Sequence, residues 1–264
     1  MPFIFISMIV AANGWFGFKL FVLGVLAALS ARNFAMGFNR WTDRKYDILN
    51  PRTASRPSVD GRLDSKSIAV FVIINAIVFI ATAYLINMLA FWLSFPILWI
   101  LASYSFFKRF SEMAHIILGL SLALAPIAGV VAVQGSITLW SIFLSVGVMF
   151  WVAGFDLLYS LQDIDFDKEN NLYSIPSRYG AKTTLTLSAL FHVLTILFWG
   201  LFVLFAHLHF FGYMAVCVSA LMLLYEHYLV RKDFTKIDRV FFTVNGYLGI
   251  IFLIFIILDK VVVI

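Results

Sequence analysis

The sequence predicts an all-α membrane protein in which residues 1–264 form one multi-span bundle of transmembrane helices. Of the 264 residues, 62% are hydrophobic and 12% are charged, whereas soluble domains average about 45–50% apolar and about 25% charged residues. Apolar segments of about 20 residues, the length that crosses the hydrocarbon core, recur along the chain. Basic residues fall in alternate connecting segments, as the positive-inside rule describes. Together these observations exclude a soluble fold.

Eight complete spans are expected, and all should be helices because backbone polar groups in lipid must be paired within each segment. Residues 1–12 are also apolar, but twelve helical residues reach only about 18 Å, against about 30 Å of hydrocarbon. We interpret this segment as the second half of a first span and expect the natural protein to begin upstream of Met1. The predicted spans are 17–37, 68–87, 89–107, 113–133, 138–160, 184–205, 208–229 and 240–262.

The distribution of basic residues predicts the orientation of the bundle. Four alternate loops, at 38–67, 108–112, 161–183 and 230–239, hold nearly all of the lysines and arginines outside the spans. The loops of the opposite face contain only Lys19 and Lys260. We therefore place the four basic loops in the cytoplasm. Membrane topology explains the net charge of +5, so we expect no nucleic-acid partner.

The first acidic motif opens the first predicted cytoplasmic loop. Asn39, Asp43 and Asp47 are spaced four residues apart, so they line one helical face if the preceding span continues. Two carboxylates and an amide oxygen form an all-oxygen ligand set of the kind that Mg²⁺ prefers. The motif therefore predicts a Mg²⁺ site, and the basic side chains between the acids are the alternative source of positive charge.

The second acidic motif lies at the cytoplasmic end of the predicted span 138–160. Asp156, Tyr159, Asp163 and Asp167 fall on one helical stripe, and Asp156 lies within the apolar span, where an ionisable residue indicates a function. Two such motifs on one face of the membrane could hold Mg²⁺ between them. The candidate catalytic residues are Asp43, Asp47, Asp156, Tyr159, Asp163 and Asp167.

Basic and polar residues beside the two motifs could bind the phosphate oxygens of a substrate, because arginine forks and lysine charges suit this role. The strongest candidate is Lys108, which shares a helix face with Tyr104 at the edge of the site. The alternative for any one cation is that it only orients the protein in the membrane. The candidate substrate-binding residues are Asn39, Arg52, Tyr104, Lys108, Arg109, Lys168 and Arg178.

At these residues the sequence resembles the UbiA superfamily of intramembrane aromatic prenyltransferases, and the resemblance covers nearly the whole chain. Three family motifs are matched by Asn39, Asp43 and Asp47; by Tyr104, Lys108, Arg109, Leu118 and Gly119; and by Tyr159, Asp163 and Asp167. The resemblance implies a fold of nine helices around a central cavity, with the first helix truncated here. Arg40 stands where the commonest form of the first motif has Asp. This departure and the NPRTA segment from Asn50 to Ala54 resemble the bacterial 4-hydroxybenzoate polyprenyltransferase-like branch.

The resemblance implies a Mg²⁺-dependent reaction in the bacterial inner membrane. The Asp pairs would hold Mg²⁺ on a polyprenyl pyrophosphate, and basic residues would neutralise the departing group. The prenyl chain would pass to an aromatic acid, either 4-hydroxybenzoate for ubiquinone or 1,4-dihydroxy-6-naphthoate for menaquinone by the futalosine route. Either Asp156 or Asp163 would accept the proton that the acceptor loses. A polyprenyl tail would also keep the substrate in membrane lipid, at about 0.8 kcal/mol per buried CH₂.

Other classes of protein explain the pattern less well. Transporters place ionisable residues near the bilayer midplane, often at broken helices of two repeats, whereas these charges gather at one face. A structural subunit needs no pair of acidic stripes, and the DG-containing motif of CDP-alcohol phosphotransferases is absent. The five histidines are scattered, and we expect them, together with Glu226, at the membrane interface rather than as metal ligands. The sequence leaves the oligomeric state open.

Overall fold

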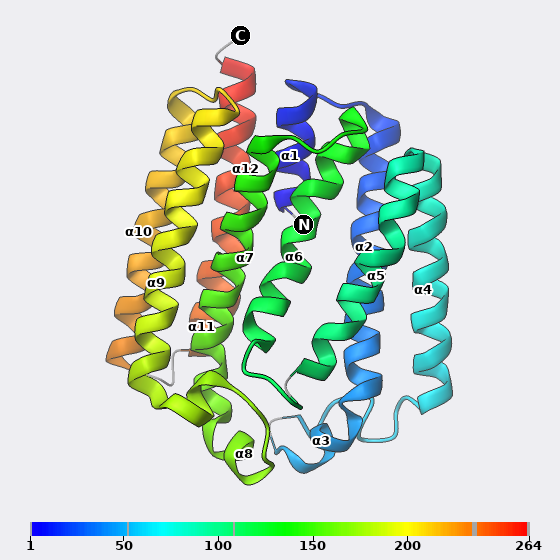
Figure 1. Cartoon of the computed structure of the whole chain (residues 1–264), viewed down its shortest axis with the longest axis vertical. Helices are drawn as coiled ribbons and strands as arrows, with labels where there is room; N and C mark the ends of the chain where they lie inside the picture. The colour runs from blue at the N-terminus through cyan, green and yellow to red at the C-terminus, as the bar shows by residue number, and fades with distance from the viewer. Residues whose placement is uncertain (1, 52, 108, 234–236, 263–264) are drawn as a thin grey trace.

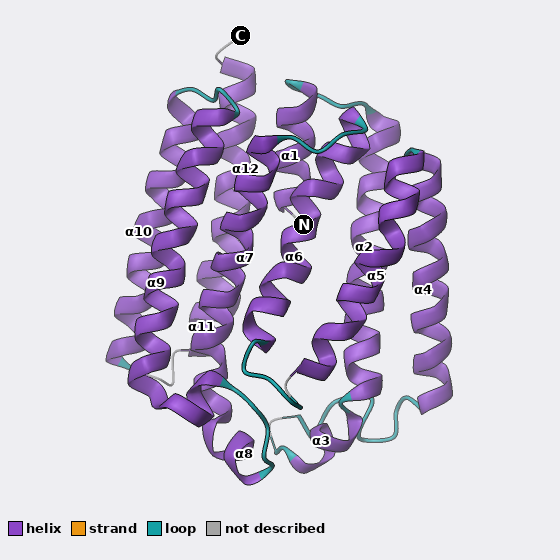
Figure 2. Ribbon diagram, viewed as in Figure 1, coloured by secondary structure: helices purple, strands orange, loops and turns teal. Residues whose placement is uncertain are grey.

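The computed structural model describes residues 2–51, 53–107, 109–233 and 237–262, and within these ranges it contains helices but no strand (Figure 2). Eight helical segments are long and apolar enough to cross a membrane, which confirms the predicted fold class. The long helices are α2 (Phe18–Thr42), α4 (Ser65–Ile86), α5 (Met88–Phe107), α6 (Ala114–Gln134), α7 (Leu139–Ser160), α9 (Ile175–Phe205), α10 (Phe210–Lys232) and α12 (Asn245–Val262). The short elements are α1 (Pro2–Ala12), α3 (Arg44–Leu49), the 3₁₀ turn η1 (Leu161–Asp163), α8 (Ile164–Glu169), α11 (Ile237–Arg239) and the π-helical turn η3 (Val240–Val244).

The main differences from the predicted spans lie at the end of the bundle that carries the acidic motifs. Helix α2 continues to Thr42 and α9 begins at Ile175, so both extend past the apolar residues that mark a span. The start of α9 is fixed by a capping box between Ser174 and Ser177, which pairs backbone N–H groups that would otherwise lack partners. The left-handed φ of 78° at Gly180 then interrupts the helix before its apolar part.

The short helix α1 is buried in the bundle, although it is only 11 residues long. It packs against α6 and α12, and its first residues lie about halfway along the bundle (Figure 1). Phe3 contacts the rings of Trp151, Trp199 and Phe252, with centroid distances of 5.2, 5.3 and 5.8 Å. Aromatic pairs at this separation are favourable beyond the area they bury, so α1 contributes to the largest core cluster.

Several apolar clusters hold the long helices together. The largest joins α1, α7, α9, α10 and α12, and another joins α2, α4 and α5 around Phe34, Val72 and Leu101. Helix α7 packs against both α6 and α9. The short helices α3 and α8 lie together at one end of the bundle, at the bottom of Figure 1, and this end carries both acidic motifs.

Several polar side chains are buried among these helices. His115, His192 and Glu226 expose 0%, 3% and 1% of their surface, so all three are enclosed by the helices. Glu226 accepts a hydrogen bond from Asn245 Nδ2 at 3.2 Å, and Asn245 in turn accepts one from Trp151 Nε1 at 2.9 Å. These bonds offset part of the cost of burying Glu226, because an unpaired polar group in apolar surroundings is costly.

At the opposite end of the bundle, Asp259 of α12 binds the first turn of α10. Its carboxylate accepts hydrogen bonds from the backbone N–H groups of His209, at 3.0 and 3.1 Å, and Gly212, at 2.9 Å. The N-cap residue of α10, His209, forms no side-chain capping bond of its own. A carboxylate from another helix therefore supplies the cap that the start of α10 needs.

Candidate active site

A cavity of about 210 Å³ opens at the end of the bundle that carries α3 and α8, and both acidic motifs line it. Side chains of α2, α3, α5, α6, α7 and α8, of the turn η1 and of the connecting segments line the cavity. Its lining consists of Asn39, Asp43, Tyr46, Asp47, Asn50, Thr53, Arg56, Tyr104, Ser105, Arg109, Ala114, Leu118, Asp156, Tyr159, Ser160, Asp163, Phe166, Asp167 and Leu172. All six predicted catalytic residues are therefore brought to one space.

The first motif does not lie on one continuous helix, contrary to prediction. Helix α2 ends at Thr42, and Asp43 is both its C-cap and the N-cap of α3. The backbone N–H of Asp43 still donates to Asn39 O, but its ψ of 3° turns the chain. Asp47 lies in the new helix α3, where its backbone N–H donates to the Asp43 carbonyl at 2.9 Å, so the turn at Asp43 sets the direction in which Asp47 reaches the cavity.

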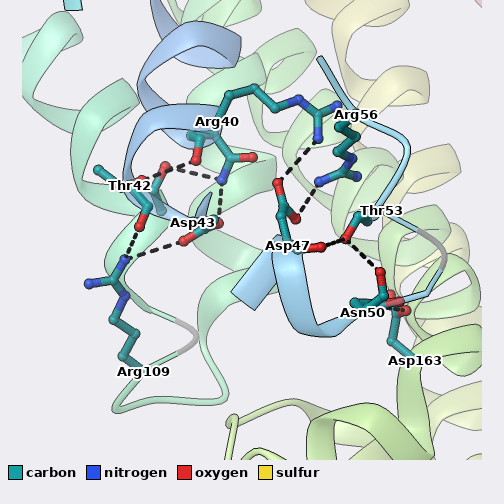
Figure 3. A network of polar contacts seen from close by, with 11 residues as sticks. Arg40, Thr42, Asp43, Asp47, Asn50, Thr53, Arg56, Arg109 and Asp163 are labelled. Carbon is teal, nitrogen blue, oxygen red and sulfur yellow. Dashed lines mark hydrogen bonds and ion pairs between the residues drawn. The ribbon is translucent and has the colours of Figure 1, made fainter. Parts of the chain in front are cut away.

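Asp43 is held by a neighbour on α2 and by one in the turn after α5. Its carboxylate accepts hydrogen bonds from Asn39 Nδ2 at 2.7 Å and from Arg109 Nη2 at 3.3 Å. The same Arg109 nitrogen donates to the carbonyl of Thr42 at 2.9 Å. Arg109 therefore fixes both the end of α2 and the first carboxylate of the motif (Figure 3).

Asp47 is the more deeply buried acid of the first motif, with 7% of its surface exposed. Arg56 Nη1 donates to its Oδ1 at 2.6 Å, and Arg40 Nη1 lies 3.7 Å from its Oδ2. Thr53 Oγ1 donates to the Asp47 carbonyl at 2.9 Å, as Figure 3 also shows. Arg40, which replaces the commoner Asp of the motif, thus places a positive charge beside a carboxylate.

The second motif reaches the cavity through a tightened turn. Asp156 and Tyr159 belong to α7, Asp163 to the 3₁₀ turn η1, and Asp167 to α8. Asn50 Nδ2 donates to Asp163 Oδ1 at 3.3 Å, so a side chain that follows α3 connects the two motifs (Figure 3). Asp165 lies off the stripe and is exposed, as expected.

Asp156 has a partner that the sequence did not reveal. His115 of α6 lies with its Nδ1 at 2.7 Å from Asp156 Oδ2. The histidine side chain is 1% exposed and the Asp156 side chain 17% exposed. An imidazole from the adjacent helix α6 therefore contacts a carboxylate that lines the cavity.

The predicted substrate-binding residues separate into three groups. Asn39, Tyr104 and Arg109 line the cavity. Lys168 and Arg178 are not among its lining residues, and Arg52 and Lys108 lie outside the described residues.

Arg178 is engaged in contacts beside the cavity. It pairs with Glu112 and lies over the ring of Tyr173, with 4.9 Å from its guanidinium carbon to the centroid. A hydrogen bond from the Glu112 backbone, together with the bond from Arg178, lowers the pKa of the Glu112 carboxyl. Glu112 therefore stays ionised, and Arg178 keeps a negative partner, at neutral pH.

Sequence reasoning missed several residues that line the cavity. Asn50 and Thr53 belong to the NPRTA segment, which was noted only as a family feature. Ser105 Oγ accepts a hydrogen bond from Asn39 Nδ2 at 3.3 Å. Nothing in the sequence distinguishes this serine from the serines that donate to a carbonyl of their own helix. Arg56 had a sequence signal, since it is one of several cations after the first motif.

The oxygen atoms around the cavity suit Mg²⁺. Within the described ranges, no group of three or more Asp, Glu, His or Cys residues could hold an ion by itself. Mg²⁺ usually binds one or two carboxylates together with substrate phosphates. Two separate pairs of acidic residues on one cavity match this ligand set. Asp47 Oδ2 is buried and accepts no hydrogen bond from the described residues, which leaves an acceptor available. Asn39, Asp43, Asp47, Asp163 and Asp167 would hold the ion.

Span-length helices that bring two acidic motifs and several arginines to one cavity define a multi-pass membrane protein with a candidate phosphate-binding site. Residues 1–256 match the UbiA prenyltransferase family. The chain belongs to this family and is a membrane prenyltransferase, which confirms the resemblance seen in the sequence.

Individual relatives agree with this assignment. The chain is 26% identical to a 4-hydroxybenzoate octaprenyltransferase of Tolumonas auensis over 84% of its own length and 77% of the relative's. It is 24% identical to the protein of the same name from Francisella tularensis over 97% of its length and 88% of the relative's.

The fold is also similar to solved structures of UbiA homologues. For the apo homologue from Aeropyrum pernix the TM-score is 0.88 at 28% identity, over 98% of this chain and 95% of that one. A homologue from Archaeoglobus fulgidus, solved with DMAPP and Mg²⁺, gives a TM-score of 0.73 at 19% identity, over 97% and 95% of the two chains. These likenesses confirm the bundle architecture predicted from the sequence.

Proposed function

We propose that this protein transfers a polyprenyl group from polyprenyl diphosphate to 4-hydroxybenzoate, with Mg²⁺, in the synthesis of a respiratory quinone. The observation that carries the proposal is the meeting of two distant acidic motifs and Arg56 and Arg109 on one cavity. The names of the relatives support the acceptor, and the homologue solved with DMAPP and Mg²⁺ supports the donor and the ion. The alternative acceptor is 1,4-dihydroxy-6-naphthoate.

The arginines of the site are suited to a diphosphate. Arg56 and Arg109 line the cavity, and each is held by one carboxylate of the first motif. A guanidinium has five donor N–H groups, so each arginine can keep its carboxylate and still donate to a phosphate oxygen. We include Arg52 and Lys108 among the proposed diphosphate ligands, and Lys168 and Arg178 as cations that attract the diphosphate from outside the cavity.

The residues of the chain then have separate tasks. Bound Mg²⁺ would stabilise negative charge on the diphosphate as the bond to the prenyl carbon breaks. Asp43 and Asp47 from one side and Asp163 and Asp167 from the other orient the diphosphate head, and the arginines neutralise it as it leaves. Apolar residues beside the acids, such as Leu118 and Phe166, exclude water that would otherwise capture the allylic cation.

The location of the reaction follows from the two ends of the donor substrate. The prenyl tail partitions into lipid, and the long helices expose many large apolar side chains. The diphosphate needs the polar cavity at the bundle end. We propose that this end faces the cytoplasm of the bacterial inner membrane, because the loops around it carry most of the basic residues.

The proposal is tested with membranes that contain the full chain, a polyprenyl diphosphate and Mg²⁺. Parallel reactions receive 4-hydroxybenzoate or 1,4-dihydroxy-6-naphthoate, and the lipid extract is analysed by mass spectrometry. We expect a prenylated product with 4-hydroxybenzoate that disappears when EDTA is added. Product only with the naphthoate would replace the acceptor, and no product with either acceptor from folded protein would refute the proposal.

A further inference from the structure

We propose that Asp156 takes the proton from the aromatic acceptor and that His115 positions the Asp156 carboxylate for this step. The inference rests on the proposed function and deepens it, because it assigns the proton acceptor within the same cavity. It also makes His115 a positioning residue, since this histidine acts through Asp156 rather than on the substrate.

In this pair the Asp156 carboxylate faces the cavity, and the buried His115 holds it in place. Asp156 lines the cavity, whereas His115 is fully buried behind it. Their contact, 2.7 Å between Asp156 Oδ2 and His115 Nδ1, uses one carboxylate oxygen. The other oxygen is then available to a substrate, and the carboxylate cannot rotate without losing its partner.

The close packing of α6 against α7 fixes the position of His115 relative to Asp156. Gly119, one turn after His115, lies so close to α7 that an added Cβ would be 2.3 Å from the carbonyl oxygen of Met149. Backbone contact between α6 and α7 leaves little freedom for the helices to slide, because interiors are closely packed. The His115–Asp156 distance is therefore set by the packing of the backbones and not by the side chains alone.

The other carboxylates of the cavity are engaged differently. Asp43 and Asp47 are paired with Arg109 and Arg56, and Asp163 accepts from Asn50. Asp156, by contrast, is bonded to His115. The carboxylates that bind arginine or are assigned to Mg²⁺ already have a role, so Asp156 is the carboxylate of the cavity that is left to accept a proton.

Its position along α7 agrees with this role. Asp156 precedes Asp163 by seven residues, and two helical turns correspond to about 10 Å. If the second motif holds the diphosphate head, Asp156 lies nearer the middle of the bundle, where the first prenyl carbon and the acceptor ring would meet. The apolar Leu118 and Ala114 of α6 line the cavity beside it.

His115 is suited to positioning rather than to passing the proton on. Its Nε2 is buried and has no hydrogen-bond partner among the described residues. His115 therefore contacts Asp156 through Nδ1 and has no second described group to which it could pass a proton. The proton from the acceptor stays on Asp156 until it is released through the cavity.

The step balances as follows. The C–O bond of the prenyl diphosphate breaks, and its electron pair leaves with the diphosphate. The ring carbon next to the phenolic hydroxyl forms a C–C bond to the allylic cation, and the ring then carries one surplus proton. Asp156 accepts that proton, aromaticity returns, and the products are the prenylated acid, diphosphate and one proton.

The test compares Asp156→Asn, His115→Leu and His115→Gln in the full-length protein with a matched control, His209→Gln, whose side chain is exposed at the opposite end. Three quantities are measured with the acceptor that the unaltered protein uses: kcat and KM for both substrates, the ratio of diphosphate released to acceptor prenylated, and Mg²⁺-dependent binding of geranyl S-thiolodiphosphate. Thermal unfolding in detergent checks that each variant is folded.

We expect Asp156→Asn to lower kcat by about 100-fold or more, as for loss of a general base, without weakening analogue binding. His115→Leu should lower kcat by about 10-fold, whereas His115→Gln, whose amide can still donate to Asp156, should stay within about threefold. The ratio of diphosphate to prenylated product should rise in the two impaired variants, because a ring intermediate that keeps its surplus proton reverts to the acceptor and the allylic cation, and water then captures the cation.

Two results would overturn the inference. One is a folded Asp156→Asn variant that keeps more than a third of the kcat, and the other is loss of analogue binding in step with activity, which would place the pair in the diphosphate site. If the unaltered protein prenylates neither acceptor, the proposed function itself fails. Turnover by the unaltered protein with unaffected variants refutes only the role of Asp156 and His115.

Discussion

The contact between α6 and α7 at Gly119 predicts that one added methyl group will impair catalysis at a distance. Gly119 does not itself line the cavity, but Leu118 and Ala114 beside it do. We therefore expect Gly119→Ala to act by moving α6 relative to α7 rather than by blocking a substrate.

The size of the effect can be worked out from the structure. The added Cβ would lie 2.3 Å from the Met149 carbonyl oxygen, while ordinary contact begins at 3.4 Å, so the helices must separate by about 1 Å. Overpacking of this kind costs about 1–3 kcal/mol in stability. A displacement of about 1 Å near reacting groups lowers rates by up to about 100-fold, and it would stretch the 2.7 Å contact between His115 and Asp156.

The assay pairs Gly119→Ala with Gly200→Ala, because an added Cβ at Gly200 of α9 meets nothing within 4 Å. Prenyl transfer and thermal unfolding are measured for both variants. We expect the first variant to lose at least 10-fold in kcat and to unfold at a lower temperature, and the second to match the unaltered protein. Equal activity and stability of the two variants would show that the α6–α7 contact adjusts without cost, and the reasoning would be wrong.

Further predictions concern the core, the arginines and the metal. Phe3→Ala should lower the free energy of unfolding by about 3 kcal/mol, as for a buried aromatic ring, while Phe210→Ala, at a side chain 66% exposed, should change it little; equal thermal unfolding of both would contradict a structural role for α1. Arg56→Gln should raise KM for the diphosphate about 10-fold, because one charge-assisted bond is lost, and Arg62→Gln, in a pair exposed to solvent, should leave KM unchanged. Asp163→Asn should abolish turnover while thermal unfolding stays cooperative, and EDTA should do the same to the unaltered protein until Mg²⁺ is restored; near-normal activity in either case would refute the metal assignment.

Span-level features of the fold were predictable because composition decides them. Each span is a run of apolar residues of fixed minimum length, and no neighbour is needed to recognise it. Which face of a span is buried was not predictable, because lipid and the bundle interior are both apolar and leave little periodicity. His192 and Glu226 illustrate this limit, since each stands in an apolar run and only the packing of the other helices makes it buried.

The acidic residues of the site were predictable, whereas their geometry was not. Carboxylates in or beside a span are rare enough to indicate a function, and this signal identified Asp43, Asp47, Asp156, Asp163 and Asp167. The turn at Asp43 depends on backbone angles that helical spacing does not reveal. His115 escaped notice because one histidine in an apolar run carries no signal until its partner on another helix is known.

The cap that Asp259 supplies to α10 has a consequence for sequence change within the family. Backbone N–H groups donate to an amide or hydroxyl oxygen about as readily as to a carboxylate at such a cap, so the position needs an oxygen acceptor and not a charge. We expect Asn, Ser or Thr to replace Asp259 in relatives that keep the helix junction. Asp47, whose oxygens face Arg56 and Arg40, has no such neutral substitute. Asp259 should therefore be substituted more often than Asp47 among relatives. The difference comes from the partners of the two carboxylates, backbone N–H groups for one and arginines for the other, and not from how deeply each is buried.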